Sequence, residues 1–336
     1  MQFSSLGNLA QSLISRQQNA SLKSELARLT SELVTGKTSD LGKRTGGDFA
    51  PSASITRELE LQDAYSLVRA EVKPRLDATQ GALEAIQNTV GSFGTDLLAA
   101  TTLDQSGAVS AQLATSREKF DAVVSYLNSS VGGVSLFAGT EIDGAALASS
   151  DDILASLTAA TATATTGPDF EAAMNDWFFS AGGGFETDAY QGGPIAAQNT
   201  QIGPNTSVKP TLTADADEIR QLLKDLASVV LISEGALTAD PSGRDDILIA
   251  ASEGLINGRS DIIDIQANIG LSQEALETAE ARSAAIVLSL TEAQSRITSV
   301  DTYEVASRLE EVQLGLESLY LITAKTSRLN LTEYLR

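Results

Sequence analysis

The chain of 336 residues contains no histidine and no cysteine. Without these side chains a protein cannot build a Ser-His-Asp relay, a thiol nucleophile or a Cys/His metal cage. Adjacent acids do occur, as in Asp151-Asp152, but such pairs are more typical of solvated loops and helix N-termini than of catalytic sites. We therefore expect no enzyme activity, no cofactor and no metal ion, so that function should depend on packing and binding surfaces.

Positive charge is scarce as well, since 23 Lys and Arg face 44 Asp and Glu, giving a net charge of -21. Nucleic acids and anionic membranes are both bound through clustered basic side chains, so we expect neither as a partner. The longest apolar runs, such as residues 284–288, are too short to span a bilayer. The N-terminal stretch also lacks the pattern of a secretory signal peptide, so secretion would need another route.

Composition divides the chain into helical arms and a different middle segment. Residues before about 130 and after about 214 are rich in helix formers, whereas the segment between them holds Gly pairs and four prolines. We predict a mainly α fold with an inserted small β domain. The expected domains are a terminal helical layer (1–45 with 300–336), a helical rod (46–131 with 215–299) and a β-rich outer domain (132–214).

Turn-forming residues predict where the helices break. The segments 35–52 and 238–246 contain enough Gly, Ser, Asp and Pro to end a helix. A further interruption is expected at 268–270, and Pro74 should kink a helix or mark its start.

Apolar residues recur at intervals of three and four near both ends of the chain, which is typical of helices that pack along one another. The N-terminal seam is Leu22, Leu26, Leu29 and Leu33, and the C-terminal seam is Val305, Leu309, Val312, Leu316 and Leu319. Because each seam needs a cover, the simplest arrangement is that the two long terminal helices pair in a coiled-coil-like manner.

More apolar residues lie near the C-terminus than this pairing can bury. Leu314 and Leu321 lie off the main stripe, as do Ile322, Leu329, Leu331 and Leu335. An apolar surplus of this kind indicates a surface that other copies of the chain complete. The last four of these residues therefore join the two seams as candidate self-assembly and helix-pairing residues.

Several stretches resemble the flagellin superfamily, and most closely its hook-filament junction branch, the FlgL-type hook-associated protein 3. They are ELARLTSELVTGKTSD (25–40), DATQGALEAIQNTV (77–90), GGVSLFAGTEIDG (132–144), AYQGGPIAAQNTQIGPNTSV (189–208) and the C-terminal pattern at 277–309. One departure is the turn after the first helix, where many relatives carry Asp-Asp-Pro or Asp-Asp-Ala and this chain reads GGDFAPS, with Asp48 alone.

This resemblance implies a structural protein of the bacterial flagellum that self-assembles into a ring between hook and filament. The implied partners are other copies of the chain, a neighbouring hook-associated protein and flagellin. It also implies unfolded export by the flagellar type III system, a cytoplasmic chaperone on the C-terminal helix and an extracellular location on the flagellum. Before assembly, both termini should be largely disordered, because neighbours supply their burial.

Two other interpretations stay open. The chain could be a filament flagellin, or a coiled-coil binding module that does not assemble and whose middle domain recognises a ligand. The aromatic stretch WFFSAGGGF (177–185) could form a sugar-binding patch, but clustered aromatics more often form the core of a small domain.

Overall fold

The computed structural model describes residues 2–103, 105–195, 199–209 and 212–334, and for 2–9, 11 and 326–334 it describes the helix but not the side chains. Its residues form two compact units. The terminal unit joins Met1–Gln62 to Ala284–Arg336, and the body unit is Asp63–Ser283. The chain therefore divides into two compact units.

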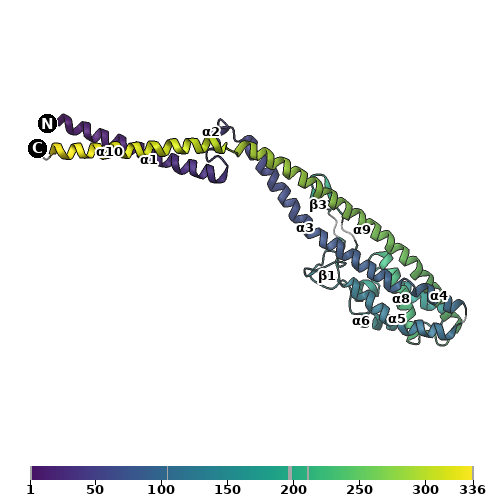
Figure 1. Ribbon diagram of the computed structural model, residues 1–336. Helices are drawn as coiled ribbons and strands as arrows, with labels where there is room; N and C mark the ends of the chain where they lie inside the picture. The colour runs from purple at the N-terminus through teal and green to yellow at the C-terminus, as the bar shows by residue number, and fades with distance from the viewer. Residues whose placement is uncertain (1, 104, 196–198, 210–211, 335–336) are drawn as a thin grey trace. The chain divides into compact units, whose positions relative to one another are not determined.

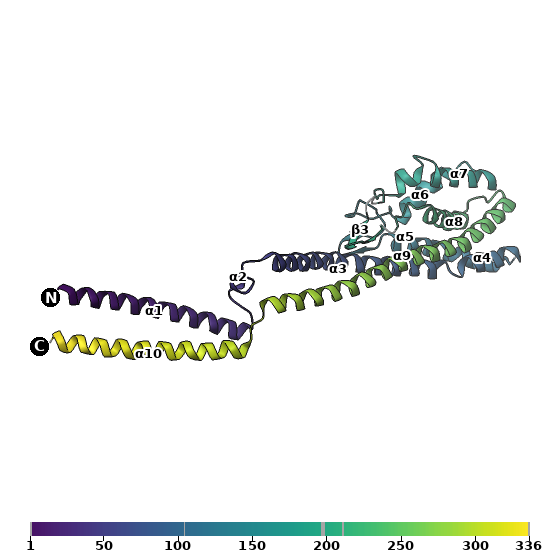
Figure 2. The ribbon, with the colours of Figure 1, turned by 90° about the horizontal axis from the view of Figure 1, so that it is seen from above.

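The terminal unit is built around two long helices, α1 (Gln2–Thr35) and α10 (Thr302–Tyr334). They lie side by side and antiparallel, with the start of α1 and the end of α10 at the same end of the pair (Figures 1 and 2). The short α2 (Leu41–Arg44) and parts of α3 (Ala50–Val90) and α9 (Pro241–Thr298) complete the unit.

A short backbone bridge holds the end of α1 beside the start of α10. Gly36 has a φ of +66°, the left-handed conformation that commonly ends a helix, and its N–H donates to the Glu32 carbonyl. The Val300 N–H donates to the Gly36 carbonyl over 3.0 Å, and the Thr38 N–H donates to the Thr298 carbonyl over 2.7 Å. These bonds fix where the two seams begin relative to each other.

The expected breaks at 35–52 and 238–246 are confirmed. The Asp48 carboxylate accepts a hydrogen bond from the Ala50 N–H at 3.0 Å and caps the start of α3. The single aspartate of the GGDFAPS turn is therefore enough to cap the helix. Asp240 likewise accepts from the Gly243 N–H at 3.0 Å, and α9 begins at Pro241.

The expected interruption at 268–270 is absent, since α9 runs through it, and Pro74 lies inside α3 and does not mark a helix start. The physical reason is burial next to each weak point. Ile269 is 1% exposed and Leu76 is 4% exposed, and such packing holds a long helix against a locally poor propensity.

The body unit surrounds one closed hydrophobic core. Its helices are α4 (Phe93–Thr102), α5 (Ser106–Leu127) and α8 (Asp217–Ser233), and in both views they lie together with the early part of α9 (Figures 1 and 2). Glycines permit this close packing, because a Cβ at Gly94 would lie 3.0 Å from Leu255 of α9. Leu83, Phe120 and Leu226 are fully buried at its centre.

The inserted segment is more helical than its Gly and Pro content predicted. It contains α6 (Ser150–Thr161), α7 (Gly167–Phe179) and the π-helical turn η1 (Phe185–Ala189) beside two antiparallel hairpins. The hairpins pair β1 (Ser130–Val131) with β2 (Val134–Ser135) and β3 (Thr200–Gly203) with β4 (Thr206–Val208). The mainly α fold with a small strand region is confirmed, but this segment is not predominantly β.

Helix caps explain that difference. Ser149 and Thr166 accept hydrogen bonds from the N–H groups of Asp152 and Asp169, so they are N-caps of α6 and α7. Pro168, which looked like a turn signal, lies in the first turn of α7, where proline is favoured.

The aromatic stretch forms core, as expected. Trp177, Phe178 and Phe185 are each at most 5% exposed, and Trp177 meets Phe178 edge to face at 4.6 Å between ring centroids. The Trp177 indole N–H donates to the Ser156 hydroxyl at 3.0 Å. This cluster belongs to the same continuous core as the flanking helices.

Candidate self-assembly surface

The two predicted seams face each other in the α1–α10 pair. Leu29, Val305 and Leu316 are buried, at 1%, 6% and 7% exposure. The other seam positions are half-buried, namely Leu22, Leu26, Leu33, Leu309, Val312 and Leu319. A pair of helices can cover only part of each side chain, so most of this seam is incompletely shielded from water.

Of the remaining predicted residues, Ile322 is the one whose side chain is described, and it does not extend the buried seam. Ile322 is 58% exposed. The side chains of Leu329 and Leu331 lie outside the described part of the chain, and Leu335 lies outside the described residues altogether.

Charged side chains support the seam at the bridge end of α1. Arg28 forms ion pairs with Glu25 and Glu32, and its guanidinium lowers the pKa of Glu25 through a hydrogen bond. Glu32 is 3% exposed, yet its carboxylate is satisfied, because it also accepts from the Ser39 N–H at 2.8 Å. This network orders the turn that leads out of α1.

Further along the pair, an open groove of about 400 Å³ runs between the helices beside Leu22, Gly315 and Leu319. A Cβ at Gly315 would lie 3.7 Å from the Leu22 side chain, so the glycine keeps the contact shallow. Asn19 and Lys23 hydrogen-bond to the Tyr320 hydroxyl across the pair and lower its pKa.

The terminal helices also expose large apolar side chains away from the seam. Leu13, Val34, Leu314 and Leu321 are between 63% and 81% exposed. Exposed apolar residues gathered on two neighbouring helices mark an interaction surface more often than isolated ones do.

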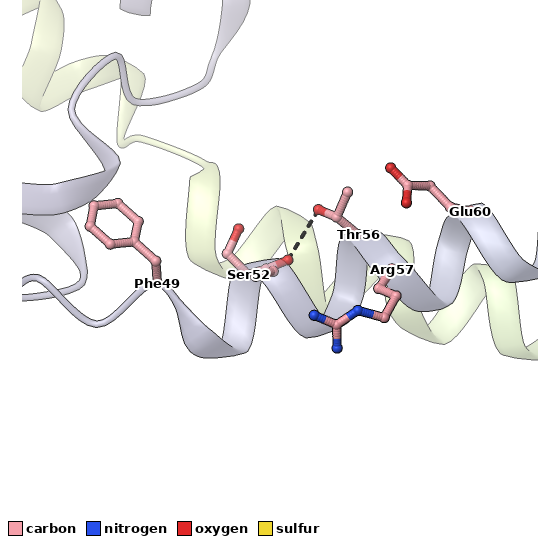
Figure 3. Close-up of a pocket in the computed structure, with 6 residues that line it drawn as sticks. Phe49, Ser52, Thr56, Arg57 and Glu60 are labelled. Atoms are coloured by element: carbon pink, nitrogen blue, oxygen red, sulfur yellow. Dashed lines mark hydrogen bonds between the residues drawn. The ribbon is translucent and has the colours of Figure 1, made fainter.

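A second hollow lies on the first turns of α3 (Figure 3). Phe49, Ser52, Ala53, Thr56, Arg57 and Glu60 line it, and the Thr56 hydroxyl donates to the Ser52 carbonyl at 3.0 Å. Arg57 and Glu60 point in different directions from one helix face, so they do not converge on a bound group (Figure 3).

Within the described part of the chain, no three acidic side chains gather closely enough to hold a metal ion. No described helix is both long and apolar enough to cross a bilayer.

The N-terminal part of the chain, residues 7–141, matches the family model of the bacterial flagellin N-terminal helical region. This part of the chain is flagellin-like. This match confirms the resemblance drawn from the sequence stretches, and it spans most of α1 and the first helices of the body unit.

The fold of this flagellin-like chain resembles that of FlgL from Bacillus cereus, with a TM-score of 0.50, 16% identity and coverage of 72% of this chain and 100% of FlgL. A candidate flagellar hook-associated protein from Vibrio parahaemolyticus gives a TM-score of 0.49 and 14% identity, over 73% of this chain and 94% of that one. No curated protein sequence matches significantly. The likeness to FlgL shows a shared fold.

Two sequence stretches of the flagellin-like chain, FAGT and YQGG, form one interlock in the body unit. The Gly193 N–H donates to the Ala138 carbonyl at 2.9 Å, and the Thr140 N–H donates to the Pro194 carbonyl at 3.1 Å. Gly139 has a φ of +63°, and a Cβ there would lie 2.3 Å from the Gly193 carbonyl oxygen. Only glycine fits at this crossing, a contact that local sequence patterns could not reveal.

The body unit of this flagellin-like chain also holds a buried acid that the sequence analysis missed. Asp225 of α8 is 4% exposed, and its carboxylate accepts hydrogen bonds from a neutral group, the Gln221 amide, at 3.0 Å. A Cβ at Gly254 of α9 would lie 2.0 Å from the carboxylate, so α9 packs directly on it. Burial raises the pKa of Asp225 to about 7.

Proposed function

We propose that this chain is a structural protein of the bacterial flagellum that self-assembles into a ring joining hook to filament. The observation that carries this proposal is the α1–α10 pair of a flagellin-like chain, whose seam is only partly shielded and whose outer sides expose further leucines. Apolar surface that one copy leaves exposed to water is buried when copies pack together, and this burial stabilises the assembly. In this role the seam residues hold the terminal helices together, and Ile322 and the leucines beyond it contribute to contacts between copies.

The likeness to FlgL favours a hook-associated role over that of a filament flagellin. The proposed partners are other copies, a neighbouring hook-associated protein and flagellin. Residues 132–214 face outward in the assembly. Export proceeds unfolded through the flagellar type III system, and a chaperone shields the apolar C-terminal helix beforehand.

Immunogold electron microscopy of intact flagella tests this function, with antibody raised against residues 150–210 and preimmune serum as the control. We expect label in a short zone where hook meets filament. Label along the whole filament would make the chain a filament flagellin. Absence of label from every flagellum would favour the interpretation that the chain is a binding module that does not assemble.

A further inference from the structure

The outward side of α10 carries a second regular pattern. Glu310, Leu314, Glu317 and Leu321 follow one another at intervals of four, three and four, so they form one stripe along the helix. At 3.6 residues per turn this stripe lies nearly opposite the seam that faces α1. Leu314 is 63% exposed and Leu321 is 65% exposed. We name these four residues the acidic stripe.

The outward side of α1 carries a matching pattern of opposite charge. Its members are exposed, lie away from the α1 seam and also recur at intervals of three and four, namely Leu13, Arg16, Ala20, Lys23 and Ala27. Lys23 lies at the edge of this row, where it reaches Tyr320. We name these five residues the basic stripe.

The two stripes complement each other in charge and in size. Acids alternate with leucines on α10, whereas Arg16 and Lys23 alternate with Ala20 and Ala27 on α1, so the leucines of the acidic stripe match the two alanines of the basic stripe in size. Among the described residues, no ion pair involves Arg16, Glu310 or Glu317. These charges are therefore available to a partner.

Apart from Lys23, which reaches Tyr320 across the pair, the residues of both stripes face away from the helix pair that carries them, so the two stripes do not meet within one copy. We propose that the acidic stripe of one copy docks on the basic stripe of the next. This inference rests on the proposed assembly function and specifies its contact. Such a contact joins two different surfaces, so each added copy presents a fresh acidic stripe, and the series closes into a ring if the rotation closes.

The charges disfavour other occupants. Docking of one acidic stripe on a second acidic stripe would place glutamates against glutamates. An anionic membrane would be repelled by the same side chains. A second copy is the partner whose complementary surface is already present on the chain.

A charge-swap experiment tests the contact in the full-length chain. One variant carries E310K and E317K, and the other carries R16E and K23E. A matched control carries E277K and E280K, which change the same residue types at exposed positions of α9 in the body unit. Sedimentation velocity measures self-association of each variant alone and of the two swap variants mixed in equal amounts.

We expect each swap variant alone to associate about tenfold more weakly than the parent chain. The mixture should recover parental association, because reversed stripes again meet opposite charges, and the control should match the parent. Parental association of either swap variant alone, a mixture no better than its components, or a parent chain that stays monomeric would each overturn the proposal.

Cross-linking provides a second measurement in case a swap variant loses its helices. Because the chain has no cysteine, L321C and A20C introduce the only thiols, and oxidation of their mixture should yield mainly the disulfide between the two variants. Equal yields of disulfide-linked dimers made of two copies of the same variant would overturn the contact. If the mixture does not recover association while antibody still labels the hook-filament zone, this inference falls and the proposed function stands. If the mixture recovers association but no flagellum is labelled, the inference stands and the proposed function falls.

Discussion

The terminal unit and the body unit bury their apolar side chains to very different degrees. In the body unit Leu83, Phe120 and Leu226 are completely enclosed, whereas in the α1–α10 seam only Leu29, Val305 and Leu316 fall below 10% exposure. Since burial supplies most of the favourable free energy of folding, the body should be stable alone and the terminal helices should depend on neighbours.

Charge separates the two units in the same way. The terminal unit carries 12 basic and 13 acidic residues, whereas the body unit carries 11 basic and 31 acidic residues. A nearly neutral unit can pack against copies of itself with little repulsion, while a strongly acidic one resists close association and stays solvated. The two units therefore differ both in stability and in their tendency to associate.

Amide hydrogen exchange on the monomer should show the largest difference between the units. Amides near Leu226 in α8 should exchange about a thousandfold more slowly than amides near Leu26 and Leu316, because the terminal helices open locally at a much lower free energy. Mass spectrometry of peptides from both units gives the comparison. Strong protection near Leu26 and Leu316 in the monomer would show that the terminal pair is stable without neighbours.

The body unit should lose stability as pH rises, through Asp225. Its folded pKa is raised to about 7 from an ordinary value of 3.8, so the folded state favours the protonated carboxyl. The protonated Asp225 therefore contributes fully to the free energy of unfolding below about pH 4, and this contribution is lost as pH rises through about 7. The loss is at most about 4 kcal/mol. Lys224 nearby favours ionisation, and Glu171 opposes it.

Urea unfolding followed by the fluorescence of Trp177, the only tryptophan, measures this effect in the body unit alone. Asp225→Asn should make the unfolding free energy nearly independent of pH between 5 and 8, as measured at one-unit steps. Glu277→Gln, at an exposed position of α9, serves as the control and should keep the parental dependence. A parental dependence in Asp225→Asn would mean that another group titrates.

The glycine interlock provides a third test within the body unit. Gly139→Ala should cost about 3 kcal/mol, because it combines a left-handed backbone with a clash against the Gly193 carbonyl. Gly144→Ala is the matched control, since a Cβ there meets no atom within 4 Å and its φ is not positive. Thermal unfolding followed by Trp177 should separate the two variants, and equal midpoints would contradict the interlock.

Regular spacing made the terminal pair predictable, because the seams at Leu22–Leu33 and Val305–Leu319 encode a helix face directly in the sequence. The caps of α6 and α7 were also present in the sequence, but Ser149 and Thr166 lay in a Gly- and Pro-rich region where turns and caps share residue types. The α-helical content of 132–214 was underestimated for that reason.

Other features could not be read from local patterns. The contact between Gly139 and Gly193 joins residues far apart in the chain, so only the folded structure brings the two stretches together. Asp225 did leave a signal, because it lies three residues after buried Leu222 and one before buried Leu226, on the apolar side of α8. An acid at such a position is conspicuous only once the helix and its buried face are known.

The smallest effect should come from the terminal seam, and it should leave the body unit unchanged. Leu29→Ala removes the most buried of the described side chains of α1 and should destabilise the helix pair by about 2 kcal/mol, the low end for leucine, because its surroundings are half open to water. Circular dichroism should show reduced helix content, while the unfolding midpoint reported by Trp177 stays constant. Leu13→Ala, at a 65% exposed position of the same helix, should change neither quantity in the monomer. A shift of the Trp177 midpoint in Leu29→Ala would instead mean that the two units unfold together, and the contrast between a self-sufficient body and dependent terminal helices would then fail.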